Sequence, residues 1–426
     1  MKDGRFAMTS HLFWESVVLG AQGRRPAEGT EGGAVIYAGV DIAKDDHVIG
    51  AIDDSGEEVC KPLAFKNSEA GFEKCVAWLE GVAESEEDVV IAMEATGHYW
   101  MACFTYLTAR GYTAVVINPV HVKAVRKLKS LSGVKNDFID AWLIAETLRI
   151  GEYEPTRLAT DEVQSLKELT RYRQGLKEQV ARTKTKVICL MDAYFPEYAG
   201  LFSDMFGAAS LALLSKSPLP IDISRMKLPA MAKLLSKASR GRLGEEQAGK
   251  VRDAAKRSIG IRLGERTAAF EIEEYIALID YLEEKVSRAD RLIEASLEKI
   301  EPLVLTIPGV SVTLGAQIVA EIGDATRFGS GASIVKYAGL NSGVSQSGNF
   351  EAKSSPITKT GSPYLRRAMW LAADSARKFD PKLRSFYEKK LAEGKCHRVA
   401  VTAVARKLCH IVYAVMRDRV PYDPDK

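Results

Sequence analysis

An apolar repeat near the middle of the chain limits the possible folds more than any other feature of the sequence. Over residues 272–300, apolar side chains recur at alternating spacings of three and four, with Ser296 as the one polar lapse. This spacing predicts a long helix with a narrow buried stripe, as in a coiled coil. A looser stripe over residues 163–187 offers an antiparallel partner in the same chain. Between the two stripes, prolines interrupt residues 194–264, where we expect a small helical insert.

The repeat divides the chain into regions of different character. Residues 1–33 lack a regular apolar pattern, and we expect a flexible leader there. Residues 34–155 predict an α/β domain, residues 156–300 the coiled-coil region with its insert, and residues 301–426 a mainly helical domain with a Ser/Gly-rich interruption. No stretch approaches the roughly 20 apolar residues that a membrane span requires.

The α/β domain has a recognisable order of strands and helices. Apolar runs at 35–41, 47–53 and 61–65 predict three successive strands, and later strands at 89–93 and 113–117 alternate with helices. A hairpin first and helical crossovers later is the order of a ribonuclease-H-like sheet, not of a uniformly alternating Rossmann sheet. The predicted fold class is therefore α/β followed by α.

Charge and cysteine content narrow the partners and the compartment. Residues 34–150 carry 11 basic and 18 acidic side chains, whereas residues 301–426 carry 19 basic and 11 acidic ones. A basic C-terminal region favours a polyanionic partner. The six cysteines are scattered without a C-x-x-C pair, so neither a zinc site nor a disulfide framework is indicated, and a reducing cytoplasm fits best.

Four acids stand at positions that suit metal binding. Asp41 ends the first predicted strand, Glu94 ends the fourth, and Asp137 and Asp140 share one face of a helix. In a ribonuclease-H-like sheet the first and fourth strands are neighbours, so the four carboxylates would converge. Their mutual repulsion requires a cation, and hard oxygen ligands select Mg²⁺ or Mn²⁺. Two such ions about 4 Å apart support phosphoryl transfer.

Basic side chains cluster at two places that suit a nucleic-acid backbone. One is a helix that begins at Pro119, and the other is the segment 359–368, where Ser362 and Pro363 predict the start of a helix. The predicted contacts are Lys123, Arg126, Lys127, Lys129, Lys135, Lys359, Arg366 and Arg367. A serine in the loop 341–355 could act as a nucleophile, but spacing does not distinguish Ser347 from Ser345 or Ser342.

Eight short motifs occur in an order that resembles a known family. They are G-V-D-I-A-K (39–44), E-A-T-G (94–97), V-I-N-P (116–119), K-N-D-x-x-D-A (135–141), P-G-V (308–310), Y-A-G-L (337–340), S-G-N (347–349) and K-T-G-S-P-Y-L-R-R-A (359–368). The chain resembles the DEDD transposases of the insertion-sequence 110 family, which includes Piv-type DNA invertases. The resemblance covers about residues 34–420. The family's K-T-D is K-N-D here, with Asn136 in place of threonine.

The resemblance implies a fold, a reaction and partners. It implies a RuvC-like domain, a coiled-coil linker and a C-terminal transposase domain. The family's acids match Asp41, Glu94, Asp137 and Asp140, and its nucleophilic serine matches Ser347. It further implies cutting and rejoining of donor and target DNA through a 5′-phosphoserine intermediate, with Mg²⁺, in a homodimer or tetramer whose active sites combine two protomers. Some members use a noncoding bridge RNA as a guide.

Three other functions are compatible with parts of the pattern. A RuvC-like nuclease would use water as the nucleophile and leave Ser347 in an ordinary loop. An ATP-binding protein of the actin or sugar-kinase type would need a Gly/Thr-rich phosphate loop after Asp41, where Ala43 and Lys44 stand instead. A coiled-coil scaffold without catalysis would not require acids at all four positions.

Overall fold

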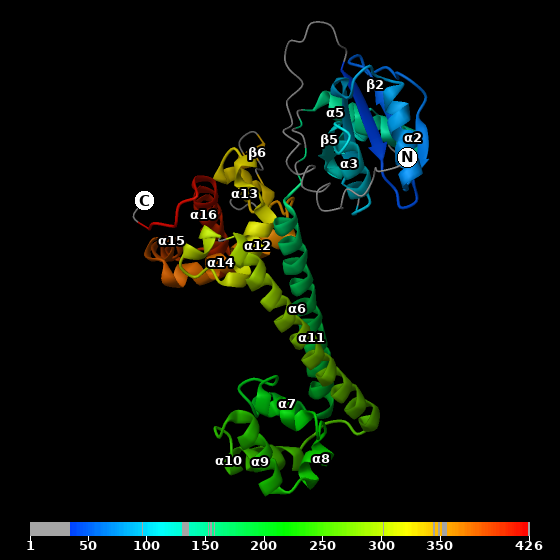
Figure 1. Cartoon of the computed structure of the whole chain (residues 1–426). Helices are drawn as coiled ribbons and strands as arrows, with labels where there is room; N and C mark the ends of the chain where they lie inside the picture. Colours follow the sequence, from blue (N-terminus) through cyan, green and yellow to red (C-terminus); the bar gives the residue numbers. More distant parts are fainter. Residues whose placement is uncertain are drawn as a thin grey trace, which may run out of the picture. The chain divides into compact units, whose positions relative to one another are not determined.

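The chain divides into two units, Met1–Leu158 and Ala159–Lys426 (Figure 1). The computed structural model describes residues 35–95, 97–129, 136–151, 153, 156, 158–300, 302–343, 346–347, 350–351 and 356–424. The predicted leader 1–33 and Lys135 lie outside these residues.

The first unit is built on a mixed five-stranded sheet. Its strands are β1 (Ile36–Asp41), β2 (Asp46–Ile52), β3 (Leu63–Lys66), β4 (Val89–Glu94) and β5 (Thr113–Ile117). Its helices are α2 (Glu69–Glu80), η1 (Glu86–Asp88), α3 (Trp100–Thr108), α4 (Pro119–Leu128) and α5 (Asp137–Ile150). The strand order is β3-β2-β1-β4-β5, with β1, β2 and β3 antiparallel and β1, β4 and β5 parallel. The α/β domain and its predicted order of elements are confirmed.

The sheet is covered on both faces because its central strands are apolar on both sides. Ala38 and Val40 pack with α2 and α3, whereas Val90 and Ala92 pack with α4 and α5. Since side chains alternate along a strand, Gly39 and Asp41 are on the face opposite Val40, the face that α5 covers.

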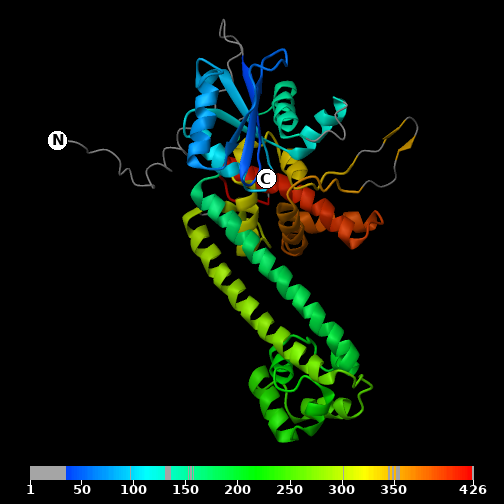
Figure 2. The same cartoon turned by 90° about the vertical axis from the view of Figure 1, so that its right-hand side faces the viewer.

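The second unit contains two long helices that lie side by side, α6 (Asp161–Tyr194) and α11 (Glu265–Ile300) (Figure 2). Lys177 donates to Glu283 at 3.0 Å, and Arg173 pairs with Asp290. Because the residue numbers of the contacts on α11 fall as those on α6 rise, the two helices are antiparallel.

The buried stripes differ in detail from the predicted ones. On α11, Ile276 and Leu297 are buried, where the strict spacing indicated Tyr275 and Ser296. The aliphatic residue beside each polar one takes the core position, which leaves the hydroxyls nearer to solvent. On α6, Tyr172 is 55% exposed instead of buried, and Gln174 is buried because Gln317 donates to its side chain at 2.7 Å.

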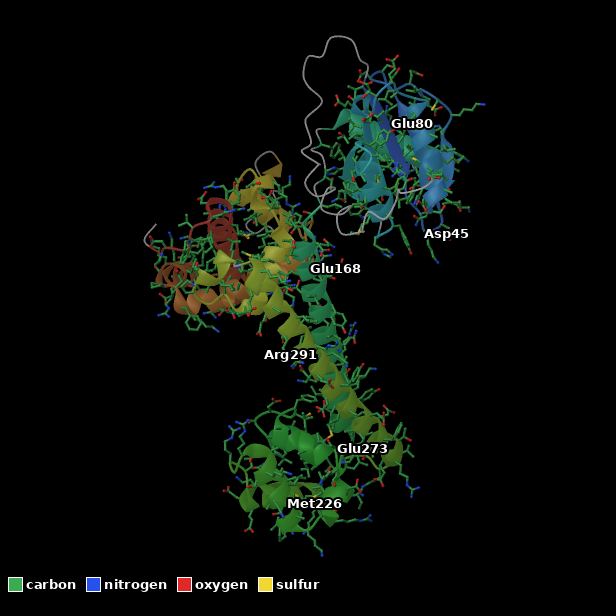
Figure 3. The ribbon with its side chains drawn as sticks, viewed as in Figure 1. Asp45, Glu80, Glu168, Met226, Glu273 and Arg291 are labelled. Carbon is green, nitrogen blue, oxygen red and sulfur yellow. The ribbon has the colours of Figure 1, made fainter. Side chains whose placement is uncertain are left out.

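The expected helical insert packs at one end of this helix pair and shares a hydrophobic core with it. It consists of η2 (Pro196–Gly200), α7 (Ala208–Leu214), α8 (Pro220–Arg225), α9 (Leu228–Ser239) and α10 (Glu245–Lys256). Tyr198, Leu213, Met231 and Val251 are fully or almost fully buried in it. Met226, labelled in Figure 3, connects α8 and α9.

The C-terminal region is mainly helical, as predicted. Its elements are η3 (Leu303–Thr306), α12 (Val312–Ile322), η4 (Ala325–Arg327), α13 (Gly331–Tyr337), β6 (Gln346–Ser347), β7 (Phe350–Glu351), α14 (Pro363–Phe379), α15 (Pro381–Ala392) and α16 (His397–Asp418). Ile318, Met369 and Leu408 are fully buried in its core. By length and composition α16 is one helix that could cross a membrane, but half of its most apolar stretch is buried here, as in a core helix.

Candidate active-site elements

Asp41 and Glu94 lie at the carboxyl ends of adjacent parallel strands. The register pairs Val40 of β1 with Met93 of β4, so the next residues, Asp41 and Glu94, are level. Neighbouring strands are about 4.8 Å apart. Side chains alternate between the two faces of the sheet along each strand. Asp41 and Glu94 both lie on the face that α5 covers, not on the face that α2 and α3 cover.

Helix α5 carries the other two acids toward the same edge of the sheet. Near its end, Arg149 donates to the carbonyl of Asp54, just after β2 and beside the start of β1. Helix α5 therefore runs antiparallel to β1, and its first turn, with Asp137 and Asp140, lies toward the Asp41 end. Asn136, which stands where the family motif has threonine, still caps α5, because its side chain accepts a hydrogen bond from the Phe138 amide at 3.1 Å.

Gly39 allows α5 to approach β1 this closely. A Cβ atom added at Gly39 would lie 2.1 Å from the carbonyl oxygen of Ala141 and 2.4 Å from the amide nitrogen of Ala145. Both neighbours are backbone atoms of α5, so no side-chain rotation could make room. The glycine in the first motif thus has a physical reason, namely the packing of the helix that carries Asp137 and Asp140.

The side chains of the four acids are not gathered around one point. Among the described residues, no group of three or more His, Cys, Asp or Glu side chains is arranged to hold a metal ion. Asp140 instead pairs with Arg126 of α4, and both side chains are largely buried. The backbone positions and the oxygen donors suit a divalent cation, whereas the side chains would have to rotate to meet it.

The predicted basic helix is α4, and its cations face two ways. Lys123 and Lys127 are exposed, as a phosphate-binding role requires. Lys129, by contrast, pairs with the buried Glu146 of α5 at 2.8 Å. Hydrogen bonds from Arg149 and Lys129 hold the pKa of the Glu146 carboxyl below its ordinary value. Arg126 and Lys129 therefore also hold α4 against α5.

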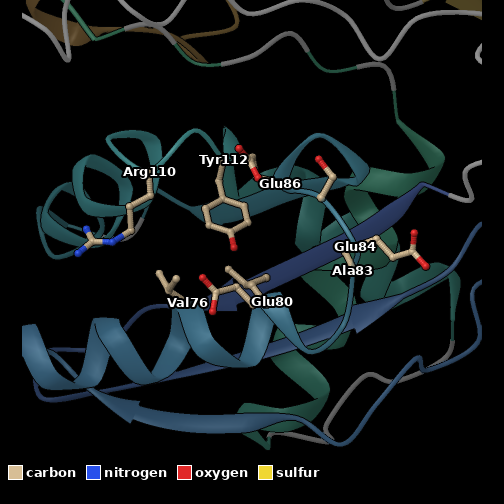
Figure 4. Close-up of a pocket in the computed structure, with 9 residues that line it drawn as sticks. Val76, Glu80, Ala83, Glu84, Glu86, Arg110 and Tyr112 are labelled. Carbon is tan, nitrogen blue, oxygen red and sulfur yellow. The ribbon is translucent and has the colours of Figure 1, made fainter.

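The first unit also has a cavity of about 330 Å³, at the end of the sheet opposite Asp41 and Glu94 (Figure 4). Glu80 and Glu86 line it together with Tyr112, which points toward Glu80. Glu86 precedes β4 and Tyr112 precedes β5, so the cavity opens at the amino ends of these strands. Glu94 is at the opposite end of β4, which separates this cavity from the four predicted acids.

The predicted nucleophile lies on a small hairpin where the sequence indicated only a loop. Strands β6 and β7 pair antiparallel, with Ser347 opposite Phe350. Ser342 forms a bridge with Ile357 nearer the base, and the Thr358 amide donates to the Asn341 carbonyl at 2.9 Å. Ser345 lies outside the described residues.

Arginines from two helices hold the start of this hairpin. Arg366 of α14 donates to the Ala338 carbonyl at 3.1 Å, and Arg406 of α16 donates to the Leu340 carbonyl at 2.7 Å. Burial lowers the pKa of Arg406. Of the predicted phosphate ligands here, Lys359 and Arg367 are exposed, whereas Arg366 is half-buried and holds the chain.

Two of the sequence motifs interlock through their glycines. A Cβ added at Gly361 would lie 1.9 Å from the Tyr337 carbonyl oxygen, and the Ser362 amide donates to that oxygen at 2.7 Å. Gly339 has a φ of 64°, in the left-handed region. The Y-A-G-L and K-T-G-S-P segments therefore pack backbone to backbone at the base of the hairpin.

Sequence reasoning missed a buried carboxylate beside these motifs. Glu321 of α12 is 1% exposed, pairs with Arg171 of α6 at 2.6 Å, and accepts from the hydroxyl of Ser362 at 2.8 Å. The Ser362 hydroxyl also caps α14. The available signal was a single charged residue in the apolar run of α12, which indicates a buried polar contact.

Two transposase family models match separate regions of this chain. A transposase family model of the DEDD insertion-sequence 110 type matches residues 38–196, and a model described as "Transposase IS116/IS110/IS902 family" matches residues 301–388. The first match contains the four predicted acids, and the second contains Ser347.

Curated relatives extend over almost the whole chain. The "Insertion element IS900 uncharacterized 42 kDa protein" of Mycobacterium paratuberculosis is 27% identical over 91% of this chain and 97% of its own length. The corresponding IS116 protein of Streptomyces clavuligerus is 24% identical over 91% of this chain and 96% of its own. The "Pilin gene-inverting protein" of Moraxella bovis is 23% identical over 91% and 97%. A solved structure of T. thermophilus RuvC with a Holliday junction covers 29% of this chain and 99% of its own, at 16% identity and a TM-score of 0.22, too low to support an argument.

Proposed function

Because this chain belongs to the IS116/IS110/IS902 family of transposases and is a DNA transposase or recombinase, we propose that it cuts and rejoins DNA through a covalent serine intermediate. The observation that carries this proposal is the level placement of Asp41 and Glu94 on β1 and β4, with the first turn of α5 toward the same edge. This arrangement, in a RuvC-like domain, would present four carboxylates to one phosphodiester.

In the proposed site Asp41, Glu94, Asp137 and Asp140 hold Mg²⁺, which Mn²⁺ could replace. The bound ion would supply charge neutralisation at the scissile phosphate and help to activate the nucleophile. The four carboxylates would hold that charge in place, and Asp140 would have to give up its contact with Arg126 to take part. Their oxygen donors suit a hard divalent cation, which is the physical basis for the assignment.

Ser347 is the proposed nucleophile, a role that rests on the resemblance to the family. Its hydroxyl oxygen forms a bond to phosphorus and loses its proton, while the bond from phosphorus to the 3′ oxygen breaks and that oxygen takes up a proton. The product is a 5′-phosphoserine and a free 3′ hydroxyl. Attack by another 3′ hydroxyl reverses these changes, joins the new strands and releases the serine.

The remaining proposals concern assembly and partners. Ser347 of one protomer would act with the acids of another, in a homodimer or tetramer located in the cytoplasm. Exposed Lys123, Lys127, Lys359 and Arg367 would contact the backbone of donor or target DNA, or of a bridge RNA. A bridge RNA would pair with both DNAs and so supply sequence specificity.

Trapping of the covalent adduct tests the serine assignment. Wild type, Ser347→Ala and Ser345→Ala are incubated with a labelled DNA substrate, any required RNA, and Mg²⁺ or EDTA. We expect a Mg²⁺-dependent adduct with wild type and Ser345→Ala but not with Ser347→Ala. Cleavage by Ser347→Ala without an adduct would instead favour a water-dependent nuclease.

A further inference from the structure

The helical insert carries an excess of positive charge. Residues 196–264 contain 12 Lys or Arg and 6 Asp or Glu, a net charge of +6, whereas the whole chain carries only +3. Residues 223–244 contain six basic residues and no acidic one. Charge of one sign at this density favours binding of a polyanion.

Five of these six basic residues lie on or next to α9. Lys227 precedes the helix, Lys233 and Lys237 lie on it, and Arg240 and Arg242 follow it. Met231 and Leu235 are fully buried and direct one face of α9 into the core of the insert. Lys233 and Lys237 are exposed and one turn apart, and Arg240, three residues later, caps the helix with a φ of 57°. We call Lys233, Lys237 and Arg240 the α9 basic face. Arg225, Lys227 and Arg242 flank it and are also exposed.

Acidic side chains of the protein do not neutralise this face. All residues of the insert are described, and the one ion pair found within it joins Lys250 to Glu246 on α10. The three cations of the α9 basic face are thus uncompensated and repel one another. An external polyanion would remove this repulsion and release its own counterions.

We propose that the α9 basic face binds the phosphate backbone of a DNA duplex. A helix about 10–12 Å across matches the major groove of B-DNA, which is about 12 Å wide, whereas the major groove of duplex RNA is too narrow for such contact. Residues 223–244 present no exposed large apolar or aromatic side chain on which unpaired bases could stack. This proposal rests on the proposed function only in that a recombinase must hold DNA. Binding of DNA to the α9 basic face does not require catalysis.

The test compares two triple variants of the full-length protein. One is Lys233→Gln/Lys237→Gln/Arg240→Gln, and the matched control is Lys250→Gln/Lys256→Gln/Arg257→Gln, on α10 and at its C-cap. Each removes three positive charges from exposed positions of the same insert. Binding of a random-sequence DNA duplex is measured against salt concentration in EDTA, with thermal unfolding to verify that each variant is folded.

We expect the first variant to lower the salt slope of log K by up to about 2.7, or 0.9 for each lost phosphate contact. The control should lower it by less than about 0.9, equivalent to one contact. Equal slopes for the first variant and wild type would overturn the proposal, as would equal losses for the two variants. An equal loss on duplex RNA would overturn the choice of DNA. Since EDTA prevents metal-dependent cleavage, a failed adduct experiment leaves this result unaffected.

Discussion

Substitution of Gly39 by alanine tests whether α5 is seated on β1 as described. The new Cβ would be 2.1 Å from the Ala141 carbonyl oxygen, 1.3 Å short of the 3.4 Å at which ordinary contact begins. Since the obstacle is backbone, α5 must move away from β1 by a comparable distance. Such overpacking costs about 1–3 kcal/mol in the free energy of unfolding. Displacing the first turn of α5 by about 1 Å should also reduce catalysis by roughly 100-fold.

Gly50 provides a matched control on the neighbouring strand. It pairs directly with Gly39, but a Cβ added there would lie 3.8 Å from the nearest atoms, an ordinary contact. Urea unfolding and Mg²⁺-dependent adduct formation are measured for both alanine variants. We expect Gly39→Ala to lose stability and activity and Gly50→Ala to retain both. Equal stability and activity of the two variants would refute the close packing of α5 on Gly39.

Three further predictions concern individual contacts. Arg126→Gln should raise Mn²⁺ affinity by up to about tenfold in a calorimetric titration, because the cation that pairs with Asp140 is removed; a lower affinity would contradict this. Gly361→Ala should abolish adduct formation but preserve DNA binding, because its Cβ would lie 1.9 Å from the Tyr337 carbonyl oxygen at the base of the hairpin; unchanged adduct yield would contradict it. The pKa of Glu146 is lowered in the folded state, so its ion pairs stabilise the protein above its ordinary pKa of 4.5, and this stabilisation is lost as the pH falls below that value. Glu146→Gln should therefore lower the urea midpoint at pH 7 and reduce its decline toward pH 4; a midpoint equal to that of wild type at pH 7 would count against it.

The sequence predicts the first unit well because its elements depend on local patterns. The apolar runs that end at Asp41 and Glu94 are continuous and bounded by turn residues, so strands and their ends can be read directly. The order of hairpin and crossovers then restricts the sheet topology to a few possibilities. Placement of the acids on one edge follows from that topology.

Other features depend on contacts between distant segments and have no local pattern. The pairing of Arg171 with Glu321 joins helices that are far apart in sequence, and the pairing of Arg126 with Asp140 depends on how two successive helices, α4 and α5, pack together. The buried Gln174 is matched by Gln317 and so violates the apolar pattern of α6. The β6–β7 strands are two residues long, too short for an alternation to be recognised. The serine assignment came from the motif resemblance, because neighbouring serines have equivalent spacing.

Metal titration of single variants tests the central claim most directly. Mn²⁺ binding to the full-length protein is measured by calorimetry for wild type, Asp41→Asn, Glu94→Gln, Asp137→Asn and Asp140→Asn, with Asp46→Asn as the control. Asp46 begins β2, the strand next to β1, and pairs with Lys66 of β3 at 2.7 Å, so it is a strict control: an acid near the same edge of the sheet that is not a proposed ligand. If the four acids form one site, each of their variants should lose or strongly weaken the same binding event, and the control should bind like wild type. Undiminished binding in Asp41→Asn or Glu94→Gln would contradict the shared metal site.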